Sequence, residues 1–158
     1  QYVNFSPDSG ASKLALSMVS EDTADVDALK QIYNYVVNNL TYDYDKAQTV
    51  ETGYLPDVDE TLSTKTGICF DYAALTTAML RSCDIPCKLQ IGYTGDIKHA
   101  WIDVYIRSKG WVTGAVSFKG DSWSLMDPTF DSSADSDDSE AIQDYIGNAD
   151  NYTVQFTR

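Results

Sequence analysis

Three residues in this chain have side chains that could carry out covalent chemistry together: Cys69, His99 and Asp127. Cys69 stands directly before a helical pattern, so we expect it in the first turn of a helix. The unpaired N–H groups of a first turn carry about half a positive charge, which stabilises a thiolate and can hold an oxyanion. A free cysteine is more often a small core residue, so Cys69 alone does not predict catalysis.

His99 is the one histidine of the chain, and it begins a predicted strand after a turn that contains Gly and Asp. An imidazole there could exchange protons with a cysteine thiol and with a leaving group. Asp127 precedes Pro128, and its carboxylate could accept a hydrogen bond from the second ring nitrogen and fix the tautomer. The simpler interpretations are a structural histidine and an aspartate that only begins a turn.

Two helices and several strands are predicted to position these residues. Apolar residues recur at steps of three and four over residues 26–39, with N-cap oxygens available from Asp22, Thr23 and Asp25. The second helix, residues 69–82, is rich in small apolar residues and is predicted to be central and buried. The predicted strands cover residues 88–93, 99–106, 111–116, 122–126 and 152–156.

The alternation within residues 99–106 separates two faces of that strand. Ala100, Ile102, Val104 and Ile106 share one face, whereas His99, Trp101, Asp103 and Tyr105 share the other. Trp101 could therefore form a wall of a substrate cleft, with core packing as the alternative.

The whole chain, residues 1–158, is predicted to be a single domain with its core in about residues 26–131. We expect residues 1–25 to be a lead-in, extended over residues 1–22. Residues 41–66 are predicted to be a long ordered loop, and residues 132–158 an acidic loop and a tail. Asp135 and Asp137 alternate as in a calcium loop, but the central glycine is missing, so we expect no metal.

Composition narrows the possible partners and the compartment. The net charge of −13 disfavours nucleic-acid binding, and no run reaches the roughly 20 apolar residues of a membrane-spanning helix. The chain begins at Gln1 rather than at a methionine, which suggests a removed signal peptide and a secreted or cell-surface protein. In an oxidising compartment Cys83 and Cys87 could pair, although two separate buried thiols are the slightly favoured alternative.

The ordered motifs resemble the transglutaminase-like superfamily over about residues 26–131. They are TKTGICFDYAALTTAMLRSCDIPCKLQIGYTG, then KHAWIDVYI, then GWV and WSLMDPTF. The resemblance places Cys69, His99 and Asp127 at the family's triad positions. It implies an α+β fold with a papain-like core, in which the cysteine lies at the N-terminus of a central helix packed on an antiparallel sheet. No cofactor is expected, and the implied substrate is a protein or peptide.

The resemblance leaves the reaction open, because the superfamily includes crosslinking transamidases, peptidases, amide hydrolases and binding modules that have lost the triad. This chain retains all three triad residues, so we expect a cysteine enzyme that acts on amide bonds through an acyl-thioester. Hydrolysis is favoured because nothing in this small chain shows how water would be excluded. The alternatives are protein-glutamine transamidation and a non-catalytic cell-surface binding domain. In some members an upstream aromatic residue helps to hold the oxyanion, and Tyr44 and Tyr54 are the candidates here.

Overall fold

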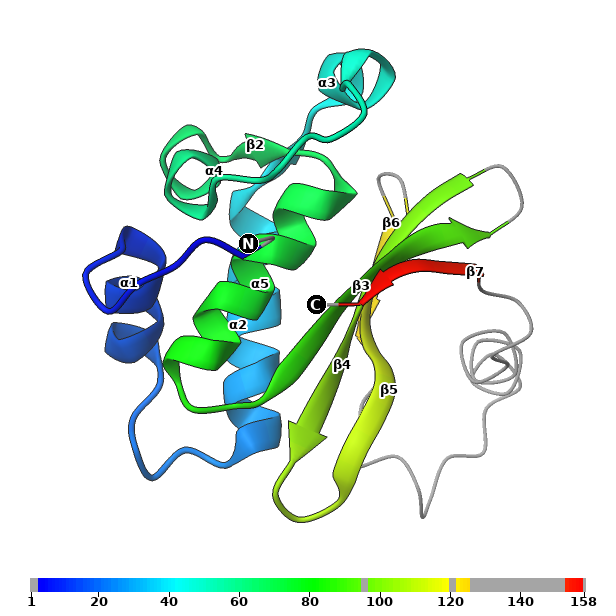
Figure 1. Ribbon diagram of the computed structural model, residues 1–158. Coiled ribbons are helices and arrows are strands. Elements are labelled where there is room, and N and C mark those ends of the chain that lie inside the picture. Colours follow the sequence, from blue (N-terminus) through cyan, green and yellow to red (C-terminus); the bar gives the residue numbers. More distant parts are fainter. Residues whose placement is uncertain (1–2, 95–96, 120–121, 126–152, 158) are drawn as a thin grey trace.

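A five-stranded antiparallel sheet packs with one face against a central helix (Figure 1). The computed structural model describes residues 3–94, 97–119, 122–125 and 153–157. The strand order is β6-β5-β4-β3-β7, and every neighbouring pair is antiparallel. The five strands are β3 (Cys87–Thr94), β4 (Ile97–Ile106), β5 (Gly110–Lys119), β6 (Ser122–Leu125) and β7 (Thr153–Thr157). The predicted α+β class is confirmed, with strand boundaries shifted by one to three residues.

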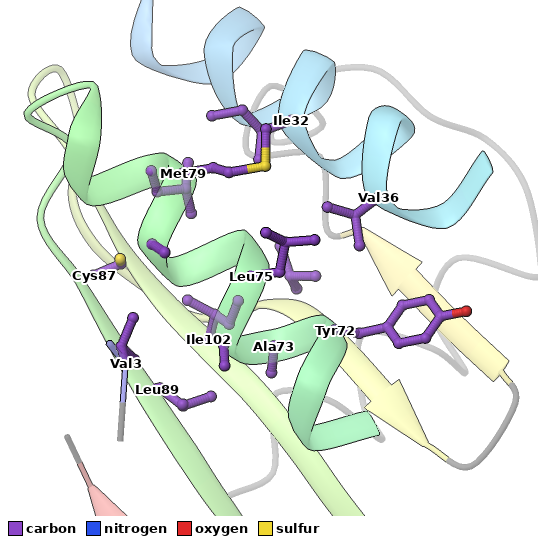
Figure 2. Packing of buried hydrophobic residues seen from close by; sticks show 14 of the residues in the cluster. Val3, Ile32, Val36, Tyr72, Ala73, Leu75, Met79, Cys87, Leu89 and Ile102 are labelled. Carbon is purple, nitrogen blue, oxygen red and sulfur yellow. The ribbon is translucent and has the colours of Figure 1, made fainter. Parts of the chain in front are cut away.

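The central helix is α5 (Cys69–Ser82), in which every residue from 69 to 80 is buried. A second helix, α2 (Asp25–Asn39), lies behind α5 in Figure 1, where it packs along α5 and also contacts β6. Figure 2 shows Leu75 and Met79 of α5 lying toward Ile32 and Val36 of α2. Alanines at three positions of α5 favour the helix and keep its surface narrow enough to be enclosed on all sides. Each large apolar side chain buried in this way contributes about 1.5–3 kcal/mol.

Burial does not alternate along the described part of β4, because Trp101 and Asp103 on the predicted face of His99 are buried as well. Ala100, Ile102, Val104 and Ile106 are buried in the core. The register between β4 and β5 shifts between Ile102 and Val104. At this bulge a carboxylate oxygen of Asp103 accepts the N–H of Gly114 at 2.9 Å, and Gly114 has a φ of 64°. Asp103 thus stabilises the bulge, in which residue 114 has a positive φ that glycine adopts more readily than other residues.

The prediction of an extended segment over residues 1–22 is wrong, because residues 10–18 form a helix, α1 (Gly10–Met18). Ser9 caps it by accepting the N–H of Ser12 at 3.2 Å. Ala11 and Ala15 are fully buried and lie one turn apart, and α1 packs against α5. The buried side of α1 consists of small residues, so its pattern shows no stripe of large apolar side chains. The core therefore extends N-terminally of residue 26.

The prediction of one long loop over residues 41–66 is also wrong, since this segment contains four short elements. They are β1 (Thr41–Tyr42), α3 (Tyr44–Thr49), α4 (Val58–Thr64) and β2 (Thr66–Gly67). Asp43 and Asp57 cap the two helices with their carboxylates. None of the four elements is longer than seven residues, which is too short for an apolar period to be recognised.

The start of α2 differs from the predicted capping. The N-cap is Ala24, which makes no side-chain cap, and Asp25 is the first helical residue. The buried carboxylate of Asp25 instead accepts the backbone N–H of Arg107 at 2.8 Å and its guanidinium at 2.6 Å. Asp25 thus joins the start of α2 to the end of β4. The hydrogen bond from the Arg107 side chain holds the pKa of Asp25 below its usual range.

Replacing Asp25 with Asn is expected to lower the melting temperature at pH 7. Because the folded pKa of Asp25 is lowered, the stability it contributes is present above its unfolded pKa of about 3.9 and disappears as the pH falls through the folded value. The difference from the wild type should therefore shrink on acidification below that value. Thermal melts between pH 7 and pH 3 measure this difference, and Asp27→Asn, at an exposed residue of the same first turn, is the control. A pH-independent difference would contradict the ion-pair explanation.

None of the helices in the described part of the chain is long and apolar enough to cross a membrane. Residues 126–152, which include Asp127 and most of the predicted acidic loop, lie outside the described residues.

Candidate active site

Cys69 is the first residue of α5, as the sequence predicts, and its side chain is buried with 5% of its surface exposed. The N–H groups of the first helical turn have no acceptor within the helix. The N-cap residue is Ile68, whose aliphatic side chain has no oxygen to accept from them. The positive end of the helix is therefore directed at the region of the Cys69 thiol, which is the arrangement that stabilises a thiolate.

His99 lies in β4, where its backbone is paired with Gly92 of β3 and Lys119 of β5. Figure 1 shows the first turn of α5 and the beginning of β4 in the same upper half of the molecule. The next residue, Ala100, is fully buried in the core. The side chain of His99, and the whole of Asp127, lie outside the described part of the chain, so the triad assignment stays a prediction.

A two-stranded parallel sheet fixes the turn that precedes Cys69. β1 and β2 pair Tyr42 with Gly67, and Asp43 donates its N–H to the carbonyl of Gly67 at 2.9 Å. The ring of Tyr42 lies 6.5 Å from that of Tyr72, which is one turn after Cys69 on α5. Tyr42 is thus placed beside the first turn of α5. This position of Tyr42 is not predictable from the sequence, because a strand of two residues is too short to show an alternating pattern.

A polar cluster of Lys46, Tyr54 and Asp71 lies at the start of α5. Asp71 is fully buried, and one of its carboxylate oxygens accepts the N–H of Ile68 at 2.8 Å. Its other oxygen accepts the hydroxyl of Tyr54 at 2.5 Å. The ammonium group of Lys46 lies 2.9 Å from Asp71, donates to the Tyr54 hydroxyl at 2.7 Å, and stands 4.5 Å from the centre of the Tyr54 ring. The cluster ties residues 46–54 to the helix that carries Cys69.

The proton positions in this cluster follow from its electrostatics. Burial, followed by the hydrogen bond to Asp71, raises the pKa of Tyr54 to about 12, so the phenol stays protonated at neutral pH. Burial by itself would lower the pKa of Lys46, but hydrogen bonds to Tyr54 and Asp71 outweigh it and the pKa is raised. Lys46 is therefore a cation that faces a buried carboxylate.

The three aromatic candidates for the cleft differ in their surroundings. Tyr54 donates its hydroxyl proton to Asp71, so in this structure that proton is directed away from an oxyanion. Tyr44 is 58% exposed, and its ring packs edge-on against Tyr42 with centroids 5.1 Å apart. Trp101 is 4% exposed, which agrees with the core-packing alternative. The oxyanion role remains a prediction for both tyrosines.

A surface hollow of about 580 Å³ lies beside the polar cluster. Lys46 and Tyr54 form part of its wall, and Cys69 is not among its lining residues. The remaining wall residues are acidic or carry hydroxyl groups: Asp43, Asp45, Thr49, Glu60, Thr61, Thr64 and Thr66. Within the described residues, no group of three or more His, Cys, Asp or Glu side chains is arranged to hold a metal ion.

The other two cysteines have environments unlike that of Cys69. Cys83 and Cys87 are separate free thiols, as in the favoured alternative, but only Cys87 is buried, whereas Cys83 is half-buried. Burial raises the pKa of Cys83, with a smaller effect of Asp84, and burial raises that of Cys87 to about 11. Both thiols are therefore poor nucleophiles at neutral pH, because the thiolate is the reactive form.

Replacing Gly67 with Ala is expected to destabilise the start of α5 by about 1–3 kcal/mol. A Cβ at this position would stand 2.6 Å from the Cβ of Asp71 and 3.0 Å from its carboxylate, so the side chain that caps the helix would have to move. Denaturant unfolding measures the change, and Thr66→Ala, at the exposed neighbouring residue, is the control. Equal stability of the two variants would show that the close approach is not needed.

Comparison with known proteins identifies related sequences and folds. The sequence profile of the transglutaminase-like superfamily matches residues 12–128. The kyphoscoliosis peptidase of Mus musculus is 24% identical over 136 residues, which cover 78% of this chain and 18% of the mouse protein. The chain spans less than a fifth of the length of the curated relatives it matches.

Two crystal structures resemble the fold. A candidate cysteine protease from Cytophaga hutchinsonii aligns with a TM-score of 0.53 and 22% identity, over 75% of this chain and 40% of its own. A candidate protease from Parabacteroides distasonis aligns with a TM-score of 0.53 and 16% identity, over 76% of this chain and 28% of its own. At these identities the similarity shows the shared fold, and it agrees with the predicted papain-like arrangement of a cysteine helix on an antiparallel sheet.

Proposed function

Because the chain belongs to the transglutaminase-like superfamily, we propose that it is a cysteine enzyme that cleaves amide bonds of a protein or peptide through a thioester at Cys69. The observation that carries the proposal is the position of Cys69 as the first residue of the buried central helix. We infer that His99 on β4 exchanges the protons and that Asp127 orients its ring.

The proposed reaction has two steps. The Cys69 thiolate attacks the amide carbon, and the first-turn N–H groups of α5 hold the negative charge that forms on the oxygen. The His99 imidazolium gives its proton to the departing amine, which leaves an acyl-thioester. A water molecule then attacks the thioester while the neutral His99 takes one of its protons. The C–S bond breaks, the acid product is released, and the Cys69 thiolate and the His99 imidazolium of the starting state are restored.

Hydrolysis and transamidation differ only in the second nucleophile. Water as the acceptor gives a protease or amidase, and a lysine amine gives a crosslinked product. We favour hydrolysis because no feature of the described residues shows how water would be kept from the thioester while an amine is admitted. The acidic wall of the neighbouring hollow would also attract a cationic amine, so transamidation is the second candidate.

One incubation distinguishes these reactions. The protein is mixed with a library of peptides and folded proteins, with and without a primary amine, and the products are identified by mass spectrometry. The proposal predicts cleaved or deamidated products whose yield is unchanged by the amine. Products that carry the amine would establish transamidation. Retention of a library member with no covalent change would favour the third possibility, a non-catalytic cell-surface binding domain.

A further inference from the structure

The Asp71 carboxylate presents an electrostatic problem for a reactive Cys69. It follows Cys69 by two residues on α5 and is fully buried. Its bond to the N–H of Ile68 draws the carboxylate back toward the first turn, so its negative charge stands at the end of the helix that should be positive. A nearby like charge disfavours ionisation of a thiol, and burial strengthens the effect because little water screens it.

Lys46 supplies the opposite charge at the same place. Its ammonium lies 2.9 Å from the Asp71 carboxylate, and the Tyr54 hydroxyl bridges the two groups. The Lys46 side chain is 31% exposed, so it reaches the buried carboxylate from the solvent side, out of the exposed helix α3. The pair is close to neutral as a unit, which leaves the field of the helix N-terminus acting on Cys69.

We propose that Lys46 and Asp71 are positioning residues for the reaction at Cys69. Asp71 fixes the turn that presents the thiol, and Lys46 cancels the charge that Asp71 would otherwise place beside the thiolate. This inference rests on the proposed function, because it requires Cys69 to be a reactive thiol. It assigns a role to α3, an exposed helix of six residues without a buried side chain.

Other ionisable groups lie around this end of α5, and none of them is substituted in the experiment described below. The carboxylates of Asp43, Asp45 and Glu60 line the neighbouring hollow. On the aromatic side are Tyr42, Tyr44 and Tyr72, and burial raises the pKa of Tyr72 well above the neutral range. From the sheet, His99 of β4 is the proposed partner of the thiol. None of these groups changes its charge in the variants below.

The test is the pH dependence of iodoacetamide labelling at Cys69 in charge variants of the pair. Lys46→Met leaves the Asp71 charge uncompensated and should raise the midpoint of the labelling curve by about one pH unit. At pH 6.5 this shift corresponds to labelling that is about tenfold slower than in the wild type. Asp71→Asn leaves the Lys46 charge uncompensated and should lower the midpoint. The double variant should have a labelling midpoint close to that of the wild type. Lys46→Arg keeps the positive charge, so its midpoint should also be close to the wild-type value.

Labelling midpoints that shift in opposite directions distinguish this role from a purely structural one. If the two residues had only a structural role, both single variants would be less stable, but their midpoints would not move in opposite directions. Lys65→Met removes an exposed charge from the C-terminal end of α4 and should leave the curve unchanged. If Asp71→Asn does not fold, the inference is still tested by comparing the labelling midpoint of Lys46→Met with the midpoints of Lys46→Arg and Lys65→Met. A Lys46→Met curve that coincides with that of Lys65→Met would overturn the inference. Failure of the proposed function has a different signature, since Cys69 would then label like an ordinary thiol in the wild type.

Discussion

Replacing Cys69 with alanine is expected to lower the rate of amide cleavage by about 10⁴-fold or more, to the level of the uncatalysed background. The thiolate forms the covalent bond of the proposed thioester, and no other group in the described residues can take its place at the start of α5. Cys69 is a small buried residue, so removing its sulfur leaves a minor cavity and the fold should remain. The measurement is the initial rate on the best peptide substrate, together with a thermal melt.

Cys83→Ala is the matched control for that experiment. It also removes a free thiol from the chain, but from the C-terminal end of α5, where burial and Asp84 raise the thiol pKa. This variant should keep the wild-type rate. Substantial cleavage by Cys69→Ala, or an equal loss in Cys83→Ala, would remove Cys69 from the reaction.

Replacing Asp127 with Asn is expected to slow the reaction by roughly a hundredfold to ten-thousandfold while the fold is kept. In the proposed triad the carboxylate accepts a hydrogen bond from His99 and stabilises the imidazolium. An amide can instead donate to that nitrogen and favour the wrong tautomer. The loss should appear in kcat more than in KM, because His99 transfers its protons in the chemical steps and not in substrate binding.

Asp131→Asn is the control for Asp127→Asn, since it makes the same chemical change four residues later in the chain. It should leave kcat unchanged. Full activity of Asp127→Asn would show that this residue only begins the turn before Pro128. Another carboxylate would then have to orient His99.

The elements that the sequence predicts well are those with long, regular patterns. α5 is recognisable from its high content of small and apolar residues, and β4 from eight alternating positions. The placement of Cys69 in a first helical turn is therefore predictable from the sequence.

Elements held by tertiary contacts rather than by their own pattern could not be predicted. α1 depends on Ala11 and Ala15 fitting closely against α5, and its Ser12 hydroxyl lies 2.8 Å from that of Ser82. β1 and β2 are two residues long and exist because they pair with each other. Sequence patterns report the periodicity of a segment and not its contacts with distant residues.

The polar cluster at the site was missed for the same reason. Lys46, Tyr54 and Asp71 are separated by 8 and 17 residues, and each is an ordinary residue in its own segment. The sequence suggested Tyr54 only as a hydrogen-bond donor to an oxyanion, whereas its hydroxyl donates to the Asp71 carboxylate. The DYA that follows Cys69 contains the available signal, because an acidic residue at the third helical position commonly caps a helix start.

The central claim is that Cys69 and His99 act as a coupled pair, and the labelling rate of Cys69 against pH tests it most directly. The chain is treated with iodoacetamide between pH 5 and pH 10, and labelling at each cysteine is followed by peptide mass spectrometry. The account predicts that wild-type Cys69 labels well below the pH of about 8.5 at which an ordinary thiol ionises, and that His99→Ala moves the curve upward and slows labelling near pH 6. A wild-type curve that rises only around pH 8–9 and is unmoved by His99→Ala would contradict it.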